Sequence, residues 1–376
     1  MPIFDQGGVE VLAREMVRRL STKWAIYLTS VDSGEAVAAS DLGDCVEDHL
    51  ELPKRLLNGE DSERVLAWAL ESKIDVFHFH LGGTLDWRTS RFDACPLTMI
   101  SAAGIPVVST CHSSLPLVNS GSSPLEAVRQ VAARVRSWPA KVRNLKAICW
   151  EAYVSQSDLS RARRMYFPAR RQMRLIYHSR LDDESQPEYG CRQDTILCVA
   201  TIVRHKGQHV LLDAFSKIAE RVPTWNLEFV GRIADRAYGD QLLTAITERG
   251  LVARVRIAGA KTDPSSDFRA AAIYVQPSLR EGLGLSLQEA MFYGCACVGT
   301  EVGGIPELLD HPSVGRVFQA GDTAQLAELL ESLCINSAER AQLGSRARLS
   351  VVEKGMTVQR MIGTYDRLYR EILGVP

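Results

Sequence analysis

Residues 277–294 read Pro-Ser-Leu-Arg-Glu-Gly-Leu-Gly-Leu-Ser-Leu-Gln-Glu-Ala-Met-Phe-Tyr-Gly, and this stretch decides the fold of the second half of the chain. An apolar run closes at its start, a turn with Gly282 and Gly284 follows, and an apolar stripe at helical spacing comes next. A strand that leads through a glycine loop into a helix is a building unit of parallel sheets. The stretch also holds two carboxylates eight residues apart, Glu281 on the loop and Glu289 in the helix.

This combination of glycines and carboxylates suits a nucleotide sugar. Glycines let the backbone approach a ligand closely, and the free N–H groups at the start of a helix attract anions. The loop can therefore hold a phosphate while Glu281 reaches a neighbouring hydroxyl. Glu289, about one helical turn further on, can accept hydrogen bonds from a vicinal diol such as a ribose. The alternative interpretation is that Glu281 complements the helix dipole and Glu289 is a surface acid.

The rest of the chain repeats this alternation of strand and helix, which predicts parallel sheets covered on both faces. We expect strands at 24–30, 75–81, 106–110, 147–154, 195–203, 226–230, 255–259, 273–277 and 296–300. We expect helices at 8–20, 62–72, 124–137, 208–221, 239–249, 285–293, 323–333 and 357–373. Ligands of such sheets bind at the carboxyl ends of the strands.

A length of 376 residues fits two domains. Residues 183–194 are acidic and poor in apolar side chains, as expected of a linker. We therefore expect a first domain over 1–182, a second over 195–355, and a terminal helix in 356–376 that packs back towards the first domain.

The composition excludes several classes of protein. Hydrophobic residues make up 46% of the chain and charged residues 24%, as in globular proteins with buried cores. The formal net charge of −1 argues against a nucleic-acid partner, and neither a signal peptide nor an apolar run of about 18 residues is visible. Nine cysteines without a CxxC pair indicate a reducing compartment. We therefore expect a cytoplasmic protein that does not span a membrane.

The stretch 277–294 closely resembles the signature of retaining GT-B glycosyltransferases of family 4, in which seven residues separate two glutamates. The resemblance continues through 298–307, 315–318 and 321–322, covers 195–373, and is looser before that. It implies an α/β fold of the GT-B type, with two Rossmann-like, doubly wound parallel-sheet domains and a cleft between them.

The resemblance also implies roles for individual residues. In that family the first glutamate contacts the donor sugar and the second contacts the ribose, and these roles fall on Glu281 and Glu289. Backbone amides of the loop would hold the sugar and the diphosphate; these are Gly282, Leu283, Gly284 and Leu285. His112 matches a histidine that would hydrogen-bond a hydroxyl of the donor sugar. Gly8, in the Gly7-Gly8 turn, would bring backbone N–H groups and a helix start to the donor phosphates.

The cationic part of the site matches less completely. Residues 200–207 correspond to the family's strand-end motif, and Lys206 falls on its phosphate-binding lysine. Thr201, however, stands where the family usually has arginine. Since charge develops on a departing diphosphate, a second cation is expected, and Arg204 and Arg232 are the nearby candidates.

The expected function is transfer of a hexose-type sugar from a nucleoside-diphosphate sugar, with UDP favoured over GDP. The acceptor would be a hydroxyl of a sugar, a lipid-linked molecule or a small molecule, as in polysaccharide, glycolipid or glycosylated-metabolite biosynthesis. Two alternatives are a non-catalytic sugar-nucleotide-binding or partner subunit, which Thr201 favours, and a nucleotide-sugar 2-epimerase. No metal or other cofactor is expected, because the chain has no DxD motif and His78, His80 and His112 have no acidic fourth ligand beside them.

Two features of the first domain raise further expectations. Residues 94–180 carry 13 lysines and arginines against three acids, and the basic residues gather in 129–174. This segment could make a peripheral contact with an anionic membrane surface, or pair with the acids of 1–93. Only six residues precede the Gly7-Gly8 turn, which is short for the central first strand of a doubly wound sheet. We expect either additional residues upstream or a minimal strand formed by Met1–Phe4.

Overall fold

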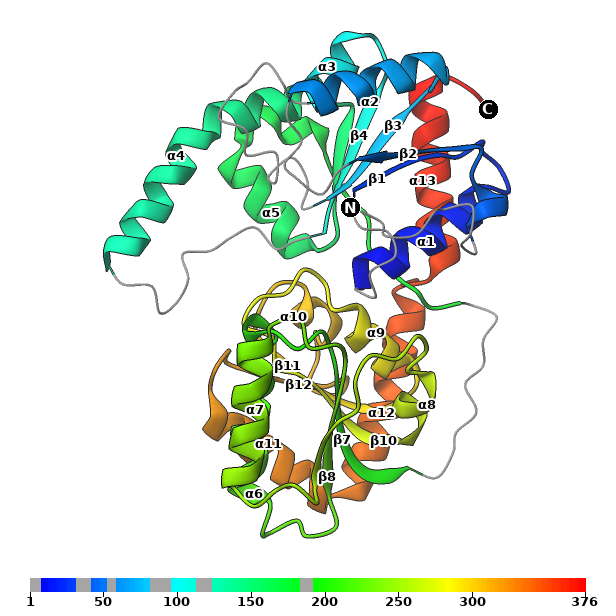
Figure 1. Ribbon diagram of the computed structural model, residues 1–376. Helices are drawn as coiled ribbons and strands as arrows, with labels where there is room; N and C mark the ends of the chain where they lie inside the picture. The colour runs from blue at the N-terminus through cyan, green and yellow to red at the C-terminus, as the bar shows by residue number, and fades with distance from the viewer. Residues whose placement is uncertain (1–7, 32–41, 53–58, 82–95, 113–123, 183–191) are drawn as a thin grey trace. The chain divides into compact units, whose positions relative to one another are not determined.

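The computed structural model of the protein describes residues 8–31, 42–52, 59–81, 96–112, 124–182 and 192–376. The chain divides into two compact units, one of Met1–Tyr177 with Met361–Pro376 and one of His178–Arg360. Both are α/β units whose described strands all run parallel to their neighbours (Figure 1). The predicted fold class is thereby confirmed, whereas the exact domain bounds stay predictions.

The described part of the second unit contains a six-stranded sheet in the order β12-β11-β10-β7-β8-β9. Its strands are β7 (Gln193–Val199), β8 (Asn226–Val230), β9 (Val255–Ile257), β10 (Ala271–Gln276), β11 (Ala296–Thr300) and β12 (Arg316–Phe318). The chain extends the sheet from β7 to β9, returns to β10 on the other side of β7, and continues to β12. The strand order therefore reverses between β7 and β10, which is where open parallel sheets bind their ligands.

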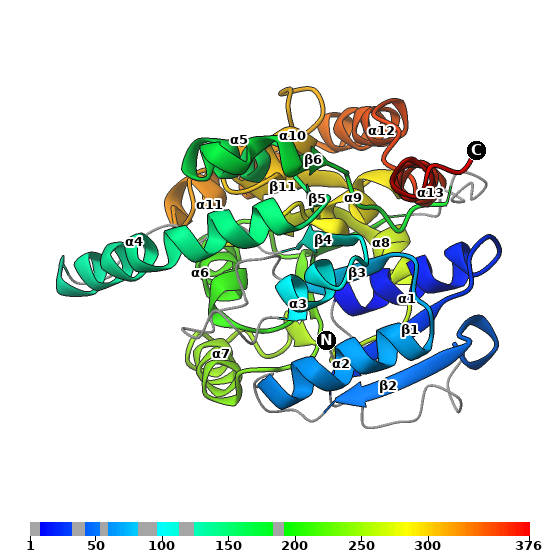
Figure 2. The same ribbon diagram turned by 90° about the horizontal axis from the view of Figure 1, so that it is seen from above.

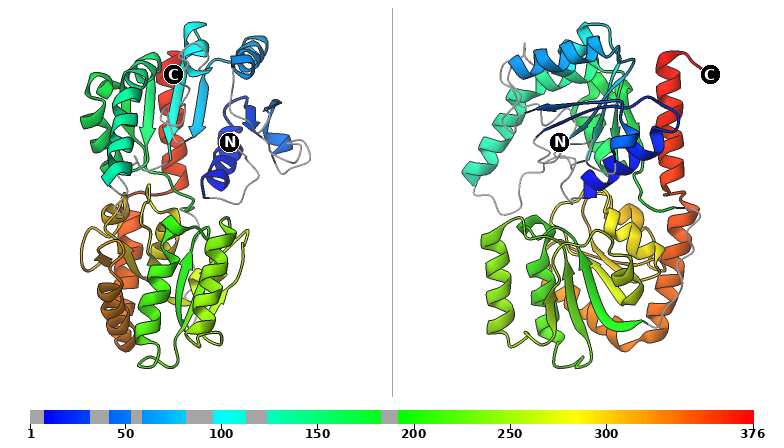
Figure 3. Two further views of the ribbon diagram at one scale, coloured as in Figure 1. Left: turned by 60° about the vertical axis from the view of Figure 1, so that its left-hand side comes forward. Right: turned by 45° about the vertical axis from the view of Figure 1, so that its right-hand side comes forward.

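Helices cover both faces of this sheet (Figure 3). One face carries α6 (Gln208–Ile218), α7 (Arg236–Glu248) and α11 (Thr323–Ile335); the other carries α8 (Ser265–Ala270), α9 (Leu285–Phe292) and α12 (Ser337–Glu353). A short α10 (Ile305–Leu308) contacts α9 and β11. Every residue of β10 and β11 is buried, as expected for strands covered on both sides.

The first unit has two parallel sheets within the described residues. One pairs β1 (Tyr27–Val31) with β2 (Asp48–Leu52), and the other has the order β3 (Phe77–Leu81), β4 (Val107–Cys111), β5 (Trp150–Tyr153), β6 (Met173–Leu175). Its helices are α1 (Gly8–Leu20), α2 (Gly59–Glu71), α3 (Pro96–Ala102), α4 (Pro124–Ala147), α5 (Gln156–Met165) and most of α13 (Val358–Leu373). Figure 2 shows α2 running alongside β2.

The side chains of β3 alternate between two environments. Phe77 and Phe79 belong to the core that α2, α3, α4 and α5 also line. His78 and His80 lie on the other side of the strand with their ring centroids 3.9 Å apart, because successive residues of a strand point to opposite faces. Tyr369 of α13 covers this second face and lies 2.5 Å from Nδ1 of His78 through its hydroxyl.

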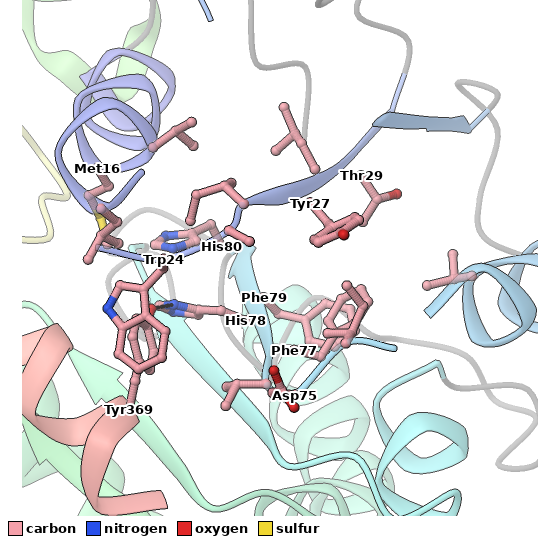
Figure 4. A pocket seen from close by; sticks show the side chains of 18 of the residues that line it. Met16, Trp24, Tyr27, Thr29, Asp75, Phe77, His78, Phe79, His80 and Tyr369 are labelled. Carbon is pink, nitrogen blue, oxygen red and sulfur yellow. Dashed lines mark hydrogen bonds between the residues drawn. The ribbon is translucent and has the colours of Figure 1, made fainter. Parts of the chain in front are cut away.

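A cavity of about 340 Å³ lies in the first unit between β1 and β3 (Figure 4). Its wall is mostly apolar and includes Met16, Trp24, Tyr27, Leu28, Phe77 and Phe79. β1 pairs with β2 and β3 with β4, and in the described residues neither strand has a partner on its other edge. Met1–Phe4 and Gly7 lie outside the described residues, so the expected first strand remains a prediction.

The structure corrects several element predictions. β2, β6 and β12 were missed, as were α3, α5 and α12 and the short α8 and α10. The helix predicted over 124–137 continues through Pro139 to Ala147, and the strand predicted over 147–154 is accordingly shortened to Trp150–Tyr153. Proline disfavours helix interiors, which is why the sequence pattern predicts an earlier end than the one observed.

Candidate active site

The site in the second unit is built from the loops that follow β7 and β10. Lys206 comes from the first loop and Glu281 from the second, and the lysine Nζ lies 3.0 Å from Oε1 and 2.9 Å from Oε2 of the glutamate. The two loops are also joined through the backbone, since the Leu279 N–H donates to the His205 carbonyl at 2.8 Å. Two side chains predicted separately from the sequence thus meet at the point where the strand order reverses.

A glycine permits the close approach of these two loops. Gly207 has φ of +73°, and a Cβ at this position would lie 1.9 Å from the Pro277 carbonyl oxygen. Any larger residue would therefore push apart the loops that carry the lysine and the glutamate.

The carboxylate of Glu281 accepts several hydrogen bonds besides its contact with Lys206. Ser278 Oγ donates to Oε2 at 2.9 Å, and Gln276 Nε2 donates to the same oxygen at 3.0 Å. Burial by itself would raise the pKa of this carboxyl, but Lys206 and the hydrogen bonds from Ser278 and the Gly282 backbone bring it below its ordinary value. The charged form is thereby favoured. Ser278 and Gln276 were not predicted from the sequence as site residues, although both lie within five residues of Glu281.

The loop from Gly282 to Leu285 leads directly into α9. Gly284 precedes the helix with φ of +96°, a conformation suited to glycine, and no described side chain caps this helix end. The first N–H groups of a helix have no partner within the helix, so they can donate to an anion. The predicted backbone donors Gly282, Leu283, Gly284 and Leu285 thus follow Glu281 without interruption.

Glu289 lies on α9 and is 9% exposed, so it is not the surface acid of the alternative interpretation. Its Oε1 lies 3.3 Å from Nη1 of Arg180, a residue that the sequence analysis did not select. Arg180 lies in the segment 178–181, which follows β6. Burial raises the pKa of Glu289, Arg180 opposes that shift, and Asp263 adds to it.

The two candidates for a second cation have other contacts. Arg204 donates to Gln241 Oε1 at 3.0 Å and lies over the ring of Tyr238, 5.6 Å from its centroid, so it contacts α7. Arg232 accepts a backbone hydrogen bond from Ile202 at 2.8 Å through its carbonyl. The substitution of either arginine for an arginine at position 201 remains a prediction.

The remaining predicted site residues belong to the first unit and are described separately. Gly8 is the first residue of α1. His112 follows β4 directly, and its Nε2 lies 3.2 Å from Nδ1 of His80. Burial lowers the pKa of His80 to about 4, so the neutral imidazole of His80 is available to share a hydrogen bond with His112. The described residues contain no group of three or more His, Cys, Asp or Glu side chains that could hold a metal ion.

Several basic residues of 129–174 have partners inside the first unit. Lys141 is buried, with its Nζ 5.1 Å from the ring centroid of Tyr166, and Arg163 donates to the Met173 carbonyl at 3.2 Å. Arg161 lies 3.5 Å from Asp158. None of the helices in the described part of the chain has the length and apolar character that a membrane crossing requires. Peripheral membrane contact through this segment remains a prediction.

Known proteins resemble this chain in both sequence and structure. Residues 182–350 match the family model described as glycosyl transferases group 1. An N-acetyl-alpha-D-glucosaminyl L-malate synthase from Bacillus anthracis is 27% identical over 53% of this chain, so the chain matches only about half (51%) of that relative. A D-inositol 3-phosphate glycosyltransferase from Paenarthrobacter aurescens is 26% identical over 98% of this chain and 93% of its own length.

Two solved structures have the same fold. HepE from Anabaena, solved with UDP and glucose, has a TM-score of 0.73 and 17% identity over 97% of this chain and 96% of its own. Sucrose-phosphate synthase from Thermosynechococcus elongatus has a TM-score of 0.76 and 18% identity over 98% of this chain and 94% of its own.

The fold and the site together define a glycosyltransferase of the GT-B class. Nearly all of the second unit, residues 182–350, matches the model of the glycosyl transferases group 1. The prediction of a transferase enzyme is confirmed.

Proposed function

We propose that the protein transfers a hexose-type sugar, with retention of configuration, from a nucleoside-diphosphate sugar to an acceptor hydroxyl. The carrying observation is the contact between Lys206 and Glu281 beside the glycine loop that opens α9. A lysine, free helix N–H groups and a carboxylate at one place supply donors for a diphosphate and an acceptor for sugar hydroxyls. Glu289, about one turn into the helix, supplies a second carboxylate for a ribose.

The proposed chemistry depends on charge that appears during the reaction. As the bond between the sugar and the diphosphate breaks, negative charge grows on the phosphate oxygens. A lysine fixed in advance at those oxygens lowers the barrier more than it strengthens ground-state binding. Glu281 is held charged beside Lys206 and can orient the donor sugar through its hydroxyls. In this proposal the departing diphosphate helps to remove the acceptor proton, so no covalent nucleophile is required.

Uridine is the favoured base in this proposal, because the solved structure of similar fold from Anabaena holds UDP and glucose. The acceptor is a sugar, a lipid-linked molecule or a small molecule, since the relatives' names include a malate synthase and an inositol phosphate glycosyltransferase. A thermal-shift screen against UDP, GDP, ADP and their sugars tests the donor. A ligand at 100 times its Kd stabilises the fold by about 2.7 kcal/mol, which is readily measured.

Four outcomes would contradict parts of this proposal. Stabilisation by GDP or ADP alone would contradict the base, and no stabilisation by any nucleotide would contradict the donor class. Once a turnover assay exists, NMR of the anomeric proton in the product decides between retention and inversion. The proposal includes no metal cofactor, so EDTA should leave turnover unchanged, and restoration of EDTA-lost activity by a divalent cation would contradict it.

A further inference from the structure

Arg180 contacts the carboxylate that the proposed function assigns to the ribose. Its Nη1 lies 3.3 Å from Oε1 of Glu289, and the two side chains are 23% and 12% exposed. Since an ionised carboxylate accepts several hydrogen bonds, this contact is compatible with a second partner on Glu289.

The backbone holds Arg180 in this place. Gln288, the residue before the glutamate, donates through Nε2 to the His178 carbonyl at 3.0 Å. Ser179, the residue after His178, donates through Oγ to the Met356 carbonyl at 2.8 Å. The segment carrying the arginine is therefore tied to the helix carrying the glutamate, and the contact does not depend on a long side chain finding its partner from a mobile surface.

Among the described residues, Arg180 is the cation whose charge acts on Glu289. The groups whose charges couple to it are Arg180, Asp263, Tyr274 and Tyr293. On the neighbouring α12, Arg348 lies over the ring of Phe292, with its Cζ 5.5 Å from the centroid. Of these groups, Arg180 is the one that favours a charged Glu289, whereas burial and Asp263 both disfavour it.

We propose that Arg180 is a positioning residue for the donor nucleotide, which holds the Glu289 carboxylate charged and oriented to accept the ribose diol. This inference rests on the proposed function, because it concerns the same nucleotide site. Only the carboxylate form can accept both hydroxyls of a diol, since a protonated carboxyl gives up acceptor capacity to its own O–H. Arg180 therefore decides the pH range over which the nucleotide binds well.

Loss of the Arg180 charge should move the pH range of good nucleotide binding to higher pH. Without Arg180, burial and Asp263 act on Glu289 unopposed, so its pKa rises and the carboxylate form is lost at a higher pH as the solution is acidified. For Arg180→Gln we expect nearly normal UDP affinity at pH 9. Below the raised midpoint we expect the affinity of Arg180→Gln to fall by up to about tenfold for each pH unit, the factor that one pH unit represents.

The experiment measures the Kd of UDP by calorimetry from pH 5.5 to pH 9 for the full chain and five variants, which are Arg180→Gln, Arg180→Lys, Glu289→Gln, the double variant of Arg180→Gln with Glu289→Gln, and Arg256→Gln. Arg180→Lys keeps the charge and should recover most of the wild-type pH profile. Arg180→Gln in a Glu289→Gln background should have no further effect, because the titrating group is already gone. Arg256→Gln is the matched control, since Arg256 pairs with Glu228 on an exposed part of the same unit.

Two results would overturn the proposal. One is a loss of UDP affinity in Arg180→Gln that is equal at every pH, which would point to direct phosphate contact or a structural role. The other is tighter UDP binding in that variant, which would mean that the arginine competes with the ribose. If Arg180→Gln does not fold, the same pH series for Arg180→Lys and wild type carries the test, and different profiles for these two equally charged residues would overturn the proposal.

A measurement on the ligand-free protein separates this inference from the proposed function. Carboxyl-labelled glutamate lets NMR follow the titration of Glu289, assigned by its absence in Glu289→Gln. A higher titration midpoint in Arg180→Gln than in wild type supports the hold of Arg180 on the carboxylate, and an unchanged midpoint overturns it. Failure of wild type to bind UDP, GDP or ADP at any pH would instead contradict the proposed function.

Discussion

Lys206 Nζ lies within 3.0 Å of both carboxylate oxygens of Glu281, a residue 75 positions further along the chain. The contact exists because β7 and β10 are neighbours at the centre of the second unit's sheet, and each strand delivers one of the two residues from its carboxyl end. Both side chains are mostly buried, with exposed fractions of 22% and 11%. The ion pair is therefore part of the candidate site and also stabilises the loops around it.

Replacement of Lys206 by alanine should lower turnover about a hundredfold, by analogy with the loss of one donor from an oxyanion hole. The reason is that charge on the leaving diphosphate grows towards the transition state, so kcat should fall more than KM rises. Lys217→Ala, an exposed lysine of α6, is the control. Turnover like that of wild type would mean that another cation, such as Arg204 or Arg232, carries this role.

Replacement of Glu289 by alanine should weaken binding of the free nucleoside diphosphate. Hydrogen bonds to a ribose exist before and during the reaction, so their loss should raise KM more than it lowers kcat. Calorimetry with UDP measures the first effect and steady-state kinetics the second. Unchanged UDP affinity in Glu289→Ala would show that this carboxylate does not bind the ribose.

Gly207→Ala and Gly250→Ala together should show how much of the loss in unfolding free energy comes from close contact and how much from backbone conformation. Gly207 and Gly250 have similar positive φ angles, +73° and +67°, but a Cβ at Gly207 would meet the Pro277 carbonyl at 1.9 Å whereas one at Gly250 would meet nothing within 4 Å. Gly250→Ala should therefore cost about 1–2 kcal/mol of unfolding free energy from conformation alone, and Gly207→Ala distinctly more. Urea unfolding measures both. Equal costs would contradict the inferred close packing of the two loops.

Stability should depend on pH through Glu281. Its pKa in the folded protein is lowered, so its charge stabilises the fold above the unfolded value of about 4.3, and this contribution disappears as the pH falls through the folded value. Glu281→Gln should therefore melt below wild type at pH 7, and the difference should shrink below about pH 4. Glu331→Gln, which removes an exposed partner of Arg221, should show a much smaller difference. A difference that stays constant from pH 3 to pH 7 would contradict this prediction.

The cavity between β1 and β3 bears on the expected first strand. Two strand edges without described partners line it, and an apolar strand placed before α1 could pair with both. Gly8 is the first residue of α1, and its backbone N–H was expected to donate to the donor phosphates. Gly8→Val should weaken donor binding. Donor binding that stays intact in Gly8→Val would contradict this expectation.

Local sequence determined most of the elements and the chemical nature of the site. Residues 226–230 and 296–300 form strands with the predicted bounds. The second is a short run buried throughout, as suits a strand covered on both faces, and the first alternates apolar with polar residues. The glycine loop before α9 and the positions of its two glutamates were likewise predicted, since they depend on neighbours within a few residues. Short strands such as Arg316–Phe318 were missed, because three residues carry too little periodic pattern to be recognised.

Only the tertiary structure decided which charges meet. Arg180 and Glu289 are 109 positions apart, and Lys206 and Glu281 are 75 apart, so no local pattern contains either pair. The order of strands brings Lys206 and Glu281 together. The hydrogen bond from Gln288 of α9 to the His178 carbonyl holds Arg180 beside Glu289. The physical reason is that a side chain's charge acts strongly only over a few ångströms, and the distances between residues remote in sequence are fixed by packing.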